Sequence, residues 1–335
     1  MKDLVTLVII LHNRHSNLDR LLEFYDNFDS PVIVADSSAE KHVFAKAMKA
    51  NITYLYMPGV TYTQKIEMVL NKIPTQYVAL CADDDFIIEQ GIYCCVDFLN
   101  GNAEYVSAQG IILKYYKNTI GRNLRFDMLY QGDYSLTSEN PAKRLADLFA
   151  PYKSLLYAVH RLTVLKTAFS NAGAAVKNLY LNEYIASIVP VLAGKHKDLN
   201  VLYQVREYAE ISDDKMTDNL DTIAAKPGYK DEFTSFINHI LDKAAGFTNM
   251  SREQLKEVLI DTLNSYADQI KSFREIKIPF VKRAGRVIEK IPIVGKSLIG
   301  NRRYSQSKLS VKKYLPAGDY RELEKVADVL NKHRA

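Results

Sequence analysis

The sequence predicts an α/β fold, in which a mostly parallel sheet is flanked by helices and is followed by an α-helical, basic C-terminal region. Apolar runs alternate with amphipathic helical patterns through about the first ninety residues, which is typical of strand–helix–strand units. Beyond about residue 197 the strand patterns fade and helical patterns take over. We therefore expect one α/β domain over residues 1–215 and a helical region over residues 216–335.

The expected elements follow one another in a regular order along the first half of the chain. Short runs rich in Val, Ile and Leu predict buried strands, and amphipathic patterns between them predict helices. The strands are expected at 4–11, 31–38 and 52–57 and from Val78, and the helices at 17–28, 40–50 and 63–73. Ser16 or Asn17 supplies the N-cap of the first helix.

The second half of the chain carries fewer strand signals. A strand at 201–212 is expected to return to the sheet, and a polar connection with a Pro-Gly break follows it. Helices are expected at 230–246 and 252–274, the second opened by a capping box of Ser251 and Gln254. Because Pro279 interrupts the pattern, we expect the second helix to end before it.

The composition is that of an ordinary soluble globular protein. Of the 335 residues, 47% are hydrophobic and 25% are charged. No window approaches about 18 uninterrupted apolar residues, and the N-terminus turns polar without a small-residue cleavage site, so we expect a cytoplasmic protein. Cys81, Cys94 and Cys95 lie in apolar segments without metal-ligand spacing and are expected to be reduced core residues.

Positive charge is concentrated near the C-terminus. Lysines and arginines are frequent between Lys271 and Lys313, where Glu275 and Glu289 are the only acidic residues. The rest of the chain is mildly acidic, which argues against a nucleic-acid-binding protein. Residues 271–313 interleave the cations with apolar side chains, a pattern that suits the anionic inner face of the cell membrane. The same pattern also suits a helical appendage that packs on the protein and leaves its basic face in solvent.

Polar clusters stand at the ends of three predicted strands. His12, Asn13 and Arg14 follow the first, Asp36 follows the second with two serines, and an acidic triplet of residues 83–85 follows the fourth. In open parallel sheets, ligands bind beyond the carboxyl ends of the strands. We therefore expect the three clusters to meet on one rim.

The acidic triplet itself suggests a cation. Like charges this close raise one another's pKa unless something compensates them. Because side chains alternate along a strand, Asp83 and Asp85 are expected on one side and Asp84 on the other. Two carboxylates form a partial shell for Mg²⁺ or Mn²⁺, completed by waters and phosphate oxygens. The alternative is a solvated acidic turn.

Several segments, in this order and spacing, resemble a known family. They are "VTLVIILHNR", "VIVADSS", "LCADDDF", "YAVHRLTVLKTAF" at 157–169 and "LYLNEYIASIVPVLAG" at 179–194. The chain is similar over about residues 4–196 to GT-A glycosyltransferases, specifically the family 2 type of bacterial polysaccharide assembly. The resemblance implies a Rossmann-like GT-A domain that binds a nucleotide sugar and passes the sugar to a glycan or lipid-linked acceptor.

The resemblance also implies roles for single residues. Asp36 matches the carboxylate that binds the nucleotide base, while Asp83 and Asp85 match the pair that holds the ribose and the metal–diphosphate. Glu183 matches the general base. The family usually carries "ED" at this position, whereas this chain has Asn182 and Glu183.

Other residues are candidates for the nucleotide-sugar site because of where they stand. They are His12, Asn13, Arg14, Lys65, Asp84, His160 and Arg161. Each has a plainer interpretation: Lys65 can be a solvated lysine, and His160 and Arg161 can be ordinary polar residues. Asp36 can cap a following helix, and Glu183 can lie on a helix surface.

The expected chemistry is metal-dependent glycosyl transfer. A divalent cation stabilises the leaving diphosphate, and a carboxylate takes the proton of the acceptor hydroxyl. One base opposite the leaving group favours inversion, although a retaining arrangement stays open. Two other functions also stay open: a sugar nucleotidyltransferase, against which the missing GxGxR loop argues, and a catalytically silent subunit that binds a membrane or a partner enzyme.

Overall fold

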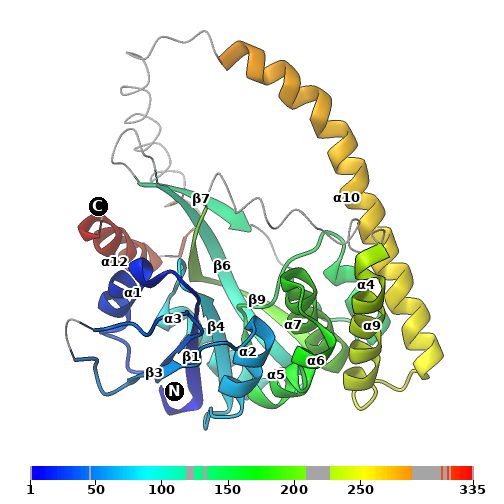
Figure 1. Cartoon of the computed structure of the whole chain (residues 1–335), viewed down its shortest axis with the longest axis horizontal. Coiled ribbons are helices and arrows are strands. Elements are labelled where there is room, and N and C mark those ends of the chain that lie inside the picture. Colours follow the sequence, from blue (N-terminus) through cyan, green and yellow to red (C-terminus); the bar gives the residue numbers. More distant parts are fainter. Residues whose placement is uncertain are drawn as a thin grey trace.

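The structure, a computed structural model, describes residues 2–44, 47–117, 124–130, 134–208, 227–288, 311, 315, 316 and 318–333. Figure 1 shows a central, curled sheet with helices packed on both of its faces. The predicted α/β fold class is confirmed.

Strands and helices alternate through the first part of the chain, and helices dominate its end. The strands are β1 (Val5–Leu11), β2 (Val32–Asp36), β3 (Ile52–Tyr56), β4 (Tyr77–Ala82), β5 (Phe86–Ile87), β6 (Tyr105–Lys117), β7 (Leu124–Tyr130), β8 (Val159–Arg161) and β9 (Lys195–Glu207). The helices are α1 (Leu18–Tyr25), α2 (Tyr62–Leu70), α3 (Glu89–Gly101), α4 (Pro141–Leu148), α5 (Leu162–Phe169), α6 (Ala172–Ala175), α7 (Leu179–Ala193), α9 (Lys230–Ala244), α10 (Arg252–Ile288) and α12 (Asp319–Lys332).

The strands of the described part of the chain join into one sheet. Their order is β3-β2-β1-β4-β8-β6-β9-β5, with β7 paired to β6. β1 to β4 pair in parallel, and so do β6 and β9. Because β8 is antiparallel to both β4 and β6, it joins two groups of strands that run in the same direction. The sheet is therefore mostly parallel, as predicted.

Alternate residues of β1 show how the sheet builds two cores. Leu7 and Ile9 belong to the apolar layer shared with α1, α3 and α12, whereas Val8 and Ile10 belong to the layer shared with α2, α5, α7 and α9. All of these side chains are buried. A strand covered by helices on both faces has to be apolar throughout, which explains the unbroken run of Val, Ile and Leu.

The predicted helix at 40–50 is wrong. The described residues of this segment form an irregular connection in which His42 and Phe44 stack edge-on, with ring centroids 4.7 Å apart. Phe44 also packs on Tyr54 of β3, and the N–H of His42 donates to the Tyr54 hydroxyl at 3.1 Å. Residues two apart lie on different faces of a helix, so this aromatic cluster is incompatible with helical structure.

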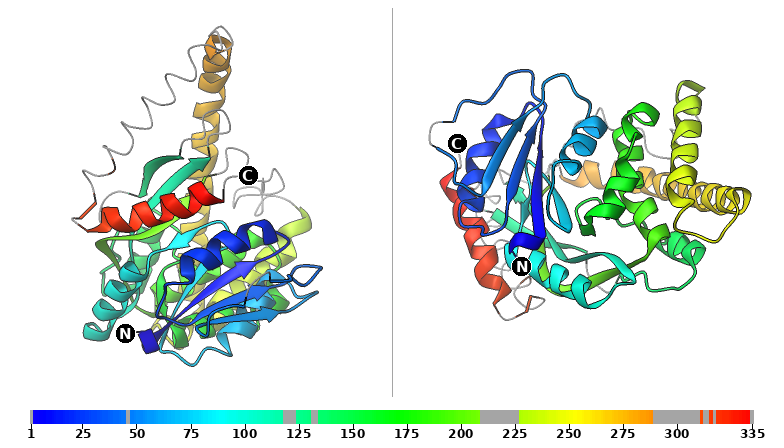
Figure 2. Two further views of the ribbon diagram at one scale, coloured as in Figure 1. Left: turned by 90° about the vertical axis from the view of Figure 1, so that its left-hand side faces the viewer. Right: turned by 90° about the horizontal axis from the view of Figure 1, so that it is seen from below.

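The second C-terminal helix is longer than predicted. Its capping box is confirmed: the Ser251 N–H donates to Gln254 Oε1 at 2.9 Å, and the Gln254 N–H donates to Ser251 Oγ at 3.2 Å. α10 then continues through Pro279 as far as Ile288. Its first half packs on the protein through Leu255, Leu259 and Leu263, while its second half extends away from the body of the molecule (Figure 2).

The described C-terminal helices pack on both faces of the α/β part. α9 contributes Phe236 and Ile240 to one core, and α12 contributes Val326 and Leu330 to the other. The predicted domain boundary near residue 215 lies outside the described residues and stays a prediction. Most of the basic segment 271–313 lies outside them as well. None of the described helices is long and apolar enough to cross a membrane.

The cysteines are free thiols. Cys81 and Cys95 are buried, and Cys94 is half-buried. Their burial agrees with the prediction of reduced residues in or near the core.

Candidate active site

A cavity of about 540 Å³ opens at the carboxyl ends of β1 and β4. Five of the predicted site residues line it. They are His12, Arg14, Lys65, Asp83 and Glu183, together with Ile10, Ser37, Val60, Thr61, Tyr62, Ala82, Leu156, Tyr157 and Leu179. The cavity therefore has charged groups from the strand ends on one side and a carboxylate from α7 among apolar side chains on the other.

The loops after β1 and β2 are tied together at the cavity edge. Asn13 takes a left-handed conformation with a φ of 54°, which asparagine tolerates better than most residues. Its N–H donates to Ser38 Oγ at 2.8 Å, and its Oδ1 accepts from the Ala39 N–H at 3.1 Å. His12 Nδ1 lies 3.0 Å from Ser37 Oγ. The common rim predicted for these loops is present, and Asn13 braces it without lining the cavity.

Asp36 is buried and fully hydrogen-bonded. Its carboxylate accepts hydrogen bonds from the backbone and hydroxyl of Ser38, from the Tyr54 hydroxyl and from His15 Nε2, the last at 2.8 Å. Burial alone raises the pKa of Asp36, but these hydrogen bonds outweigh burial and lower it. Asp36 does not itself line the cavity, whereas the adjacent Ser37 does.

Lys65 is buried, contrary to the plainer interpretation as a solvated lysine. It stands in the first turn of α2, which begins with a capping box at Thr61. Its Nζ donates to the Leu11 carbonyl at 2.6 Å and to Ser37 Oγ at 2.9 Å. Burial lowers the pKa of Lys65 to about 8. The chain thus fixes an ammonium group at the cavity wall between the ends of β1 and β2.

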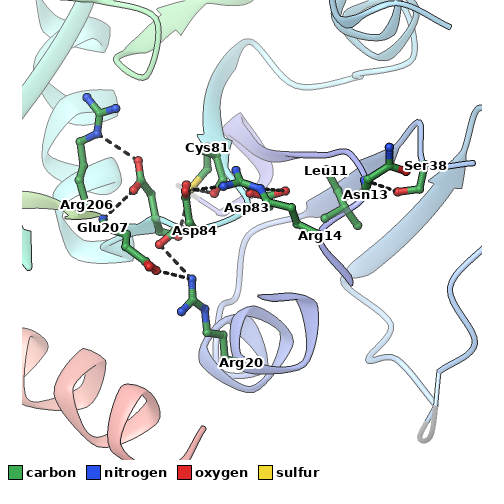
Figure 3. Close-up of polar contacts among 12 residues, drawn as sticks. Leu11, Asn13, Arg14, Arg20, Ser38, Cys81, Asp83, Asp84, Arg206 and Glu207 are labelled. Carbon is green, nitrogen blue, oxygen red and sulfur yellow. Dashed lines mark hydrogen bonds and ion pairs between the residues drawn. The ribbon is translucent and has the colours of Figure 1, made fainter. Parts of the chain in front are cut away.

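Arg14 compensates the first two carboxylates of the acidic triplet. It forms an ion pair with Asp83 and donates from Nη1 to Asp84 Oδ2 at 2.8 Å (Figure 3). The Asp83 carboxylate is buried, and burial raises its pKa to about 6 in spite of Arg14. The expectation that Asp84 points away from Asp83 is wrong. β4 ends at Ala82, so the alternation of a strand does not continue through the triplet.

Asp85 faces away from the cavity, which corrects the predicted pairing with Asp83. It accepts hydrogen bonds from Gln204 Nε2 at 3.0 Å, Arg206 Nε at 3.1 Å and the Glu207 N–H at 2.9 Å, all on β9. The turn that reverses it is closed by its own N–H, 3.3 Å from the Ala82 carbonyl. Burial raises the pKa of Asp85 to about 7, and Arg206 opposes this rise.

Two carboxylates of the triplet, Asp83 and Asp84, lie together beside Arg14. Among the described residues, no group of three or more His, Cys, Asp or Glu side chains could hold a metal ion. Mg²⁺, however, is usually bound by only one or two carboxylates plus waters and substrate phosphates. Asp83 lines the cavity, with Asp84 beside it, and is a carboxylate of the kind that could supply such a ligand.

Glu183 stands in the second turn of α7. The helix begins after Asn178, whose side chain accepts hydrogen bonds from the N–H groups of residues 180 and 181. Glu183 Oε1 accepts a hydrogen bond from the Tyr152 hydroxyl at 2.9 Å, and burial raises the pKa of the carboxyl. Its neighbour Asn182 is buried and accepts a hydrogen bond from Thr63 Oγ1 at 2.7 Å, which joins α7 to α2. The two neighbours therefore differ in role: Asn182 joins α7 to α2, and Glu183 lines the cavity.

His160 and Arg161 are not brought to the cavity. In β8, His160 pairs with Val78 and Arg161 with Tyr77, near the start of β4 and therefore far from its carboxyl end. His160 is buried and its Nε2 lies 2.7 Å from the Leu155 carbonyl. Arg161 donates to backbone carbonyls on α3 and around the α3–β6 connection. Both predicted contacts with the nucleotide sugar are corrected: the two residues brace the sheet.

Arg206, Tyr152, His15 and Tyr54 contact the predicted site residues but were not predicted. Only Arg206 had a usable signal, because a cation within the expected last strand can compensate an acidic triplet on a neighbouring strand. The other three contact the site through loops and side-chain orientations that no periodic pattern encodes.

The chain was compared with known proteins. No family model matches it, and neither does any curated protein. Similar solved structures include S. aureus TarS, with a TM-score of 0.48 at 13% identity over 78% of this chain and 43% of that chain. TarS 1–349 in complex with UDP-GlcNAc gives 0.47 at 13% identity over 78% of this chain and 72% of that chain. TarS 1–349 in complex with UDP gives 0.45 at 13% identity over 98% and 88%. The chain thus spans less than half the length of the first of these.

Proposed function

We propose that the protein is a metal-dependent glycosyltransferase, which moves a sugar from a nucleotide-diphosphate donor to a hydroxyl of a glycan or lipid-linked acceptor. One observation carries the proposal. The cavity at the strand ends combines cationic groups and the buried Asp83 carboxylate on one side with the half-buried Glu183 carboxylate on another. Diphosphate binding and proton abstraction need these two kinds of group in one pocket.

The donor is proposed to lie along the ends of β1, β2 and β4. Lys65 and Arg14 supply positive charge to the diphosphate, and His12 adds a ring nitrogen beside them. The base is proposed to lie toward Asp36 and Ser38, where buried acceptors and donors are concentrated. Fixed cations at a cavity wall stabilise the developing charge of the leaving group without reorganising during the reaction.

Asp83 and Asp84 are proposed to hold Mg²⁺ or Mn²⁺. When bound, the cation would neutralise charge that develops on the leaving diphosphate. Arg14 pairs with both carboxylates, and its guanidinium would be available to the diphosphate if they held a cation instead. Asp85 instead keeps β9 in place.

Glu183 is proposed to act as the general base. It takes the proton from the acceptor hydroxyl while that oxygen attacks the anomeric carbon and the diphosphate leaves. A raised pKa brings a carboxylate closer to neutral pH, where proton abstraction is most effective. Because donor groups and base line different walls of the cavity, we propose inversion at the anomeric carbon.

Cell-surface polysaccharide synthesis at the inner membrane face is the proposed setting. It combines a glycan or lipid-linked acceptor with the basic segment 271–313, whose composition suits an anionic surface.

Donor binding tests the proposal. Thermal-shift and calorimetric screening with a panel of UDP-, GDP-, dTDP- and CMP-sugars, each with and without Mn²⁺, is expected to reveal at least one donor whose affinity rises with the cation. UDP-GlcNAc, which TarS 1–349 holds in one solved structure, is a convenient first member of the panel. Binding without turnover would favour the silent-subunit alternative, and no binding by any donor would contradict the proposal.

A further inference from the structure

Glu183 is held by side chains from the segment that follows α4. The Tyr152 hydroxyl donates to Glu183 Oε1 at 2.9 Å, and it lies 3.2 Å from Ser187 Oγ, one turn further along α7. Ser187 Oγ in turn accepts from the Leu155 N–H at 3.1 Å. The Ser154 side chain also hydrogen-bonds to Glu183. Residues 152–155 therefore form hydrogen bonds both to the Glu183 carboxylate and to Ser187 of the same helix.

The ring of Tyr152 is clamped on several sides. Phe149 stacks on it with ring centroids 5.0 Å apart, and Tyr184 meets it edge-on at 5.1 Å. Tyr266, from α10, lies 5.6 Å from it and 5.1 Å from Phe149. A ring packed between three others has little freedom, so its hydroxyl is held at a fixed point beside Glu183. The C-terminal helix α10 contributes one of these walls.

We propose that Tyr152 is a positioning residue for Glu183, and that α10 supports this contact from outside the α/β part through Tyr266. The inference rests on the base role proposed above for Glu183. The hydroxyl holds Oε1 at a fixed point on the cavity wall and so sets the orientation in which the carboxylate meets the acceptor. A positioned base matters because small displacements of a reacting group cost large factors in rate.

Tyr152 also favours the ionised form of Glu183. Burial raises the pKa of Glu183, and hydrogen bonds from Tyr152 and Ser154 and the charge of Arg206 oppose the rise. The remaining titratable groups that face it are Tyr62, Tyr157 and Tyr184. These tyrosines stay neutral because burial raises their pKa, so removing the Tyr152 hydroxyl shifts the balance toward the protonated carboxyl.

The test is a direct titration of Glu183 by carbon-13 NMR of side-chain carboxyls, with the signal identified by its loss in Glu183→Gln. In Tyr152→Phe, which keeps the ring, the pKa of Glu183 is expected to rise by about one unit. Tyr266→Phe is the matched control, because it removes a hydroxyl from the same cluster while keeping the ring, and the pKa should stay unchanged. With a donor from the panel, Tyr152→Phe should lose about tenfold in kcat at neutral pH at unchanged donor affinity.

An unchanged Glu183 titration in a folded Tyr152→Phe protein would overturn the inference. If that variant does not fold, Ser154→Ala removes a second donor from the same carboxylate and is expected to shift its pKa in the same direction; an unmoved titration there would overturn the inference as well. Normal transfer by Glu183→Gln would instead overturn the base assignment, while the titration would still report the contact between the two side chains. The two failures are therefore distinguishable.

Discussion

At the scale of single residues, two arginines compensate the negative charge of the acidic triplet. Arg14 pairs with Asp83 and Asp84, and Arg206 pairs with Asp85 on the opposite side. Each partner comes from a different strand end, so the triplet connects β1, β4 and β9. Burial still raises the pKa of Asp83 and of Asp85, which means that the arginines compensate the charge only in part.

Substitutions at Asp83 and Asp85 are expected to act differently. Asp83→Asn should keep the melting temperature and lose cation-dependent donor affinity, because this carboxylate lines the cavity. Asp85→Asn should keep donor affinity and lose about 1–3 kcal/mol of stability, because an amide oxygen replaces two carboxylate oxygens that accept from three donors on β9. Calorimetry of both variants, with and without donor, measures the two effects. An Asp85→Asn protein that melts like the parent but no longer binds donor would contradict this division.

A buried ion pair away from the cavity gives a pH prediction. Asp198 accepts from Lys153 Nζ, and its Oδ1 lies 3.3 Å from His196 Nε2, whose other nitrogen is 2.8 Å from Ser107 Oγ. Burial opposes ionisation, but His196 and Lys153 outweigh it and lower the pKa of Asp198 to about 2. The folded pKa lies below the unfolded value of about 3.9, so the stabilisation is present at neutral pH and is lost as pH falls.

Asp198→Asn is accordingly expected to lower the free energy of unfolding by about 2 kcal/mol at pH 7. The difference from the parent should shrink to roughly half at about pH 3 and vanish below about pH 2. Urea unfolding across this pH range measures it. A difference that stays constant would show that the ion pair does not contribute as described.

Residues that follow strand ends could be predicted because the fold class places them on one rim, and His12, Arg14 and Asp83 line the cavity. Lys65 and Glu183 also line it, but they stand on α2 and α7, and Glu183 was predicted from the family resemblance. The orientation of Asp85 could not be predicted, because it depends on a turn that begins where β4 ends. The positions of His160 and Arg161 depend on the antiparallel pairing of β8, which a pattern of apolar residues does not specify.

α12 shows, at the scale of elements, how the end of the chain completes the fold. It packs against α1 with Leu323, Val326 and Leu330 buried (Figure 1). The Asp319 carboxylate accepts from the Leu202 N–H at 2.7 Å and so joins the helix to β9. The apolar side chains of α1 are therefore covered partly by the sheet and partly by α12.

Deletion of residues 318–335 is expected to expose this face and to cause aggregation. Lys332→Ala is the matched control, because it removes only an exposed ion pair with Glu23 and should leave the melting temperature close to that of the parent. Size-exclusion chromatography and thermal melting compare the two. A monomeric deletion variant with the parent's melting temperature would contradict the role given to α12.

Elements with a strong period were predictable, and those built from tertiary contacts were not. β1, α1 and α2 have bounds close to the predicted ranges, with both helices ending a few residues early. The segment at 40–50 has helix-forming residues, yet His42 and Phe44 pack with Tyr54 and leave no helix among its described residues. The end of α10 was also not predictable. A proline in the sequence suggests a helix end, but the helix continues past Pro279 to Ile288.

At the scale of the whole molecule, the described C-terminal helices pack on the α/β part. The first half of α10 packs on one core and α12 packs on the other. Truncation before the basic segment 271–313 would also remove α12. Its role is therefore better tested by replacing charges than by shortening the chain.

Replacement of Lys290, Lys296, Arg302 and Arg303 by glutamine tests the proposed membrane contact. The parent is expected to co-sediment with anionic vesicles at low salt and less at higher salt, because exposed charges are screened beyond about 8 Å at physiological ionic strength. The variant should lose this association and keep donor binding. No binding of the parent to anionic vesicles at low salt would contradict the proposal.

Turnover of nucleotide sugars by the parent and by Glu183→Gln tests the central claim most directly. The parent is expected to release nucleoside diphosphate from at least one donor of the panel in a reaction that depends on Mg²⁺ or Mn²⁺. Glu183→Gln should bind that donor with parental affinity and lose about 10²-fold or more in transfer, since the amide cannot take up a proton. Equal turnover by the two proteins, or no turnover of any donor by the parent, would contradict the account.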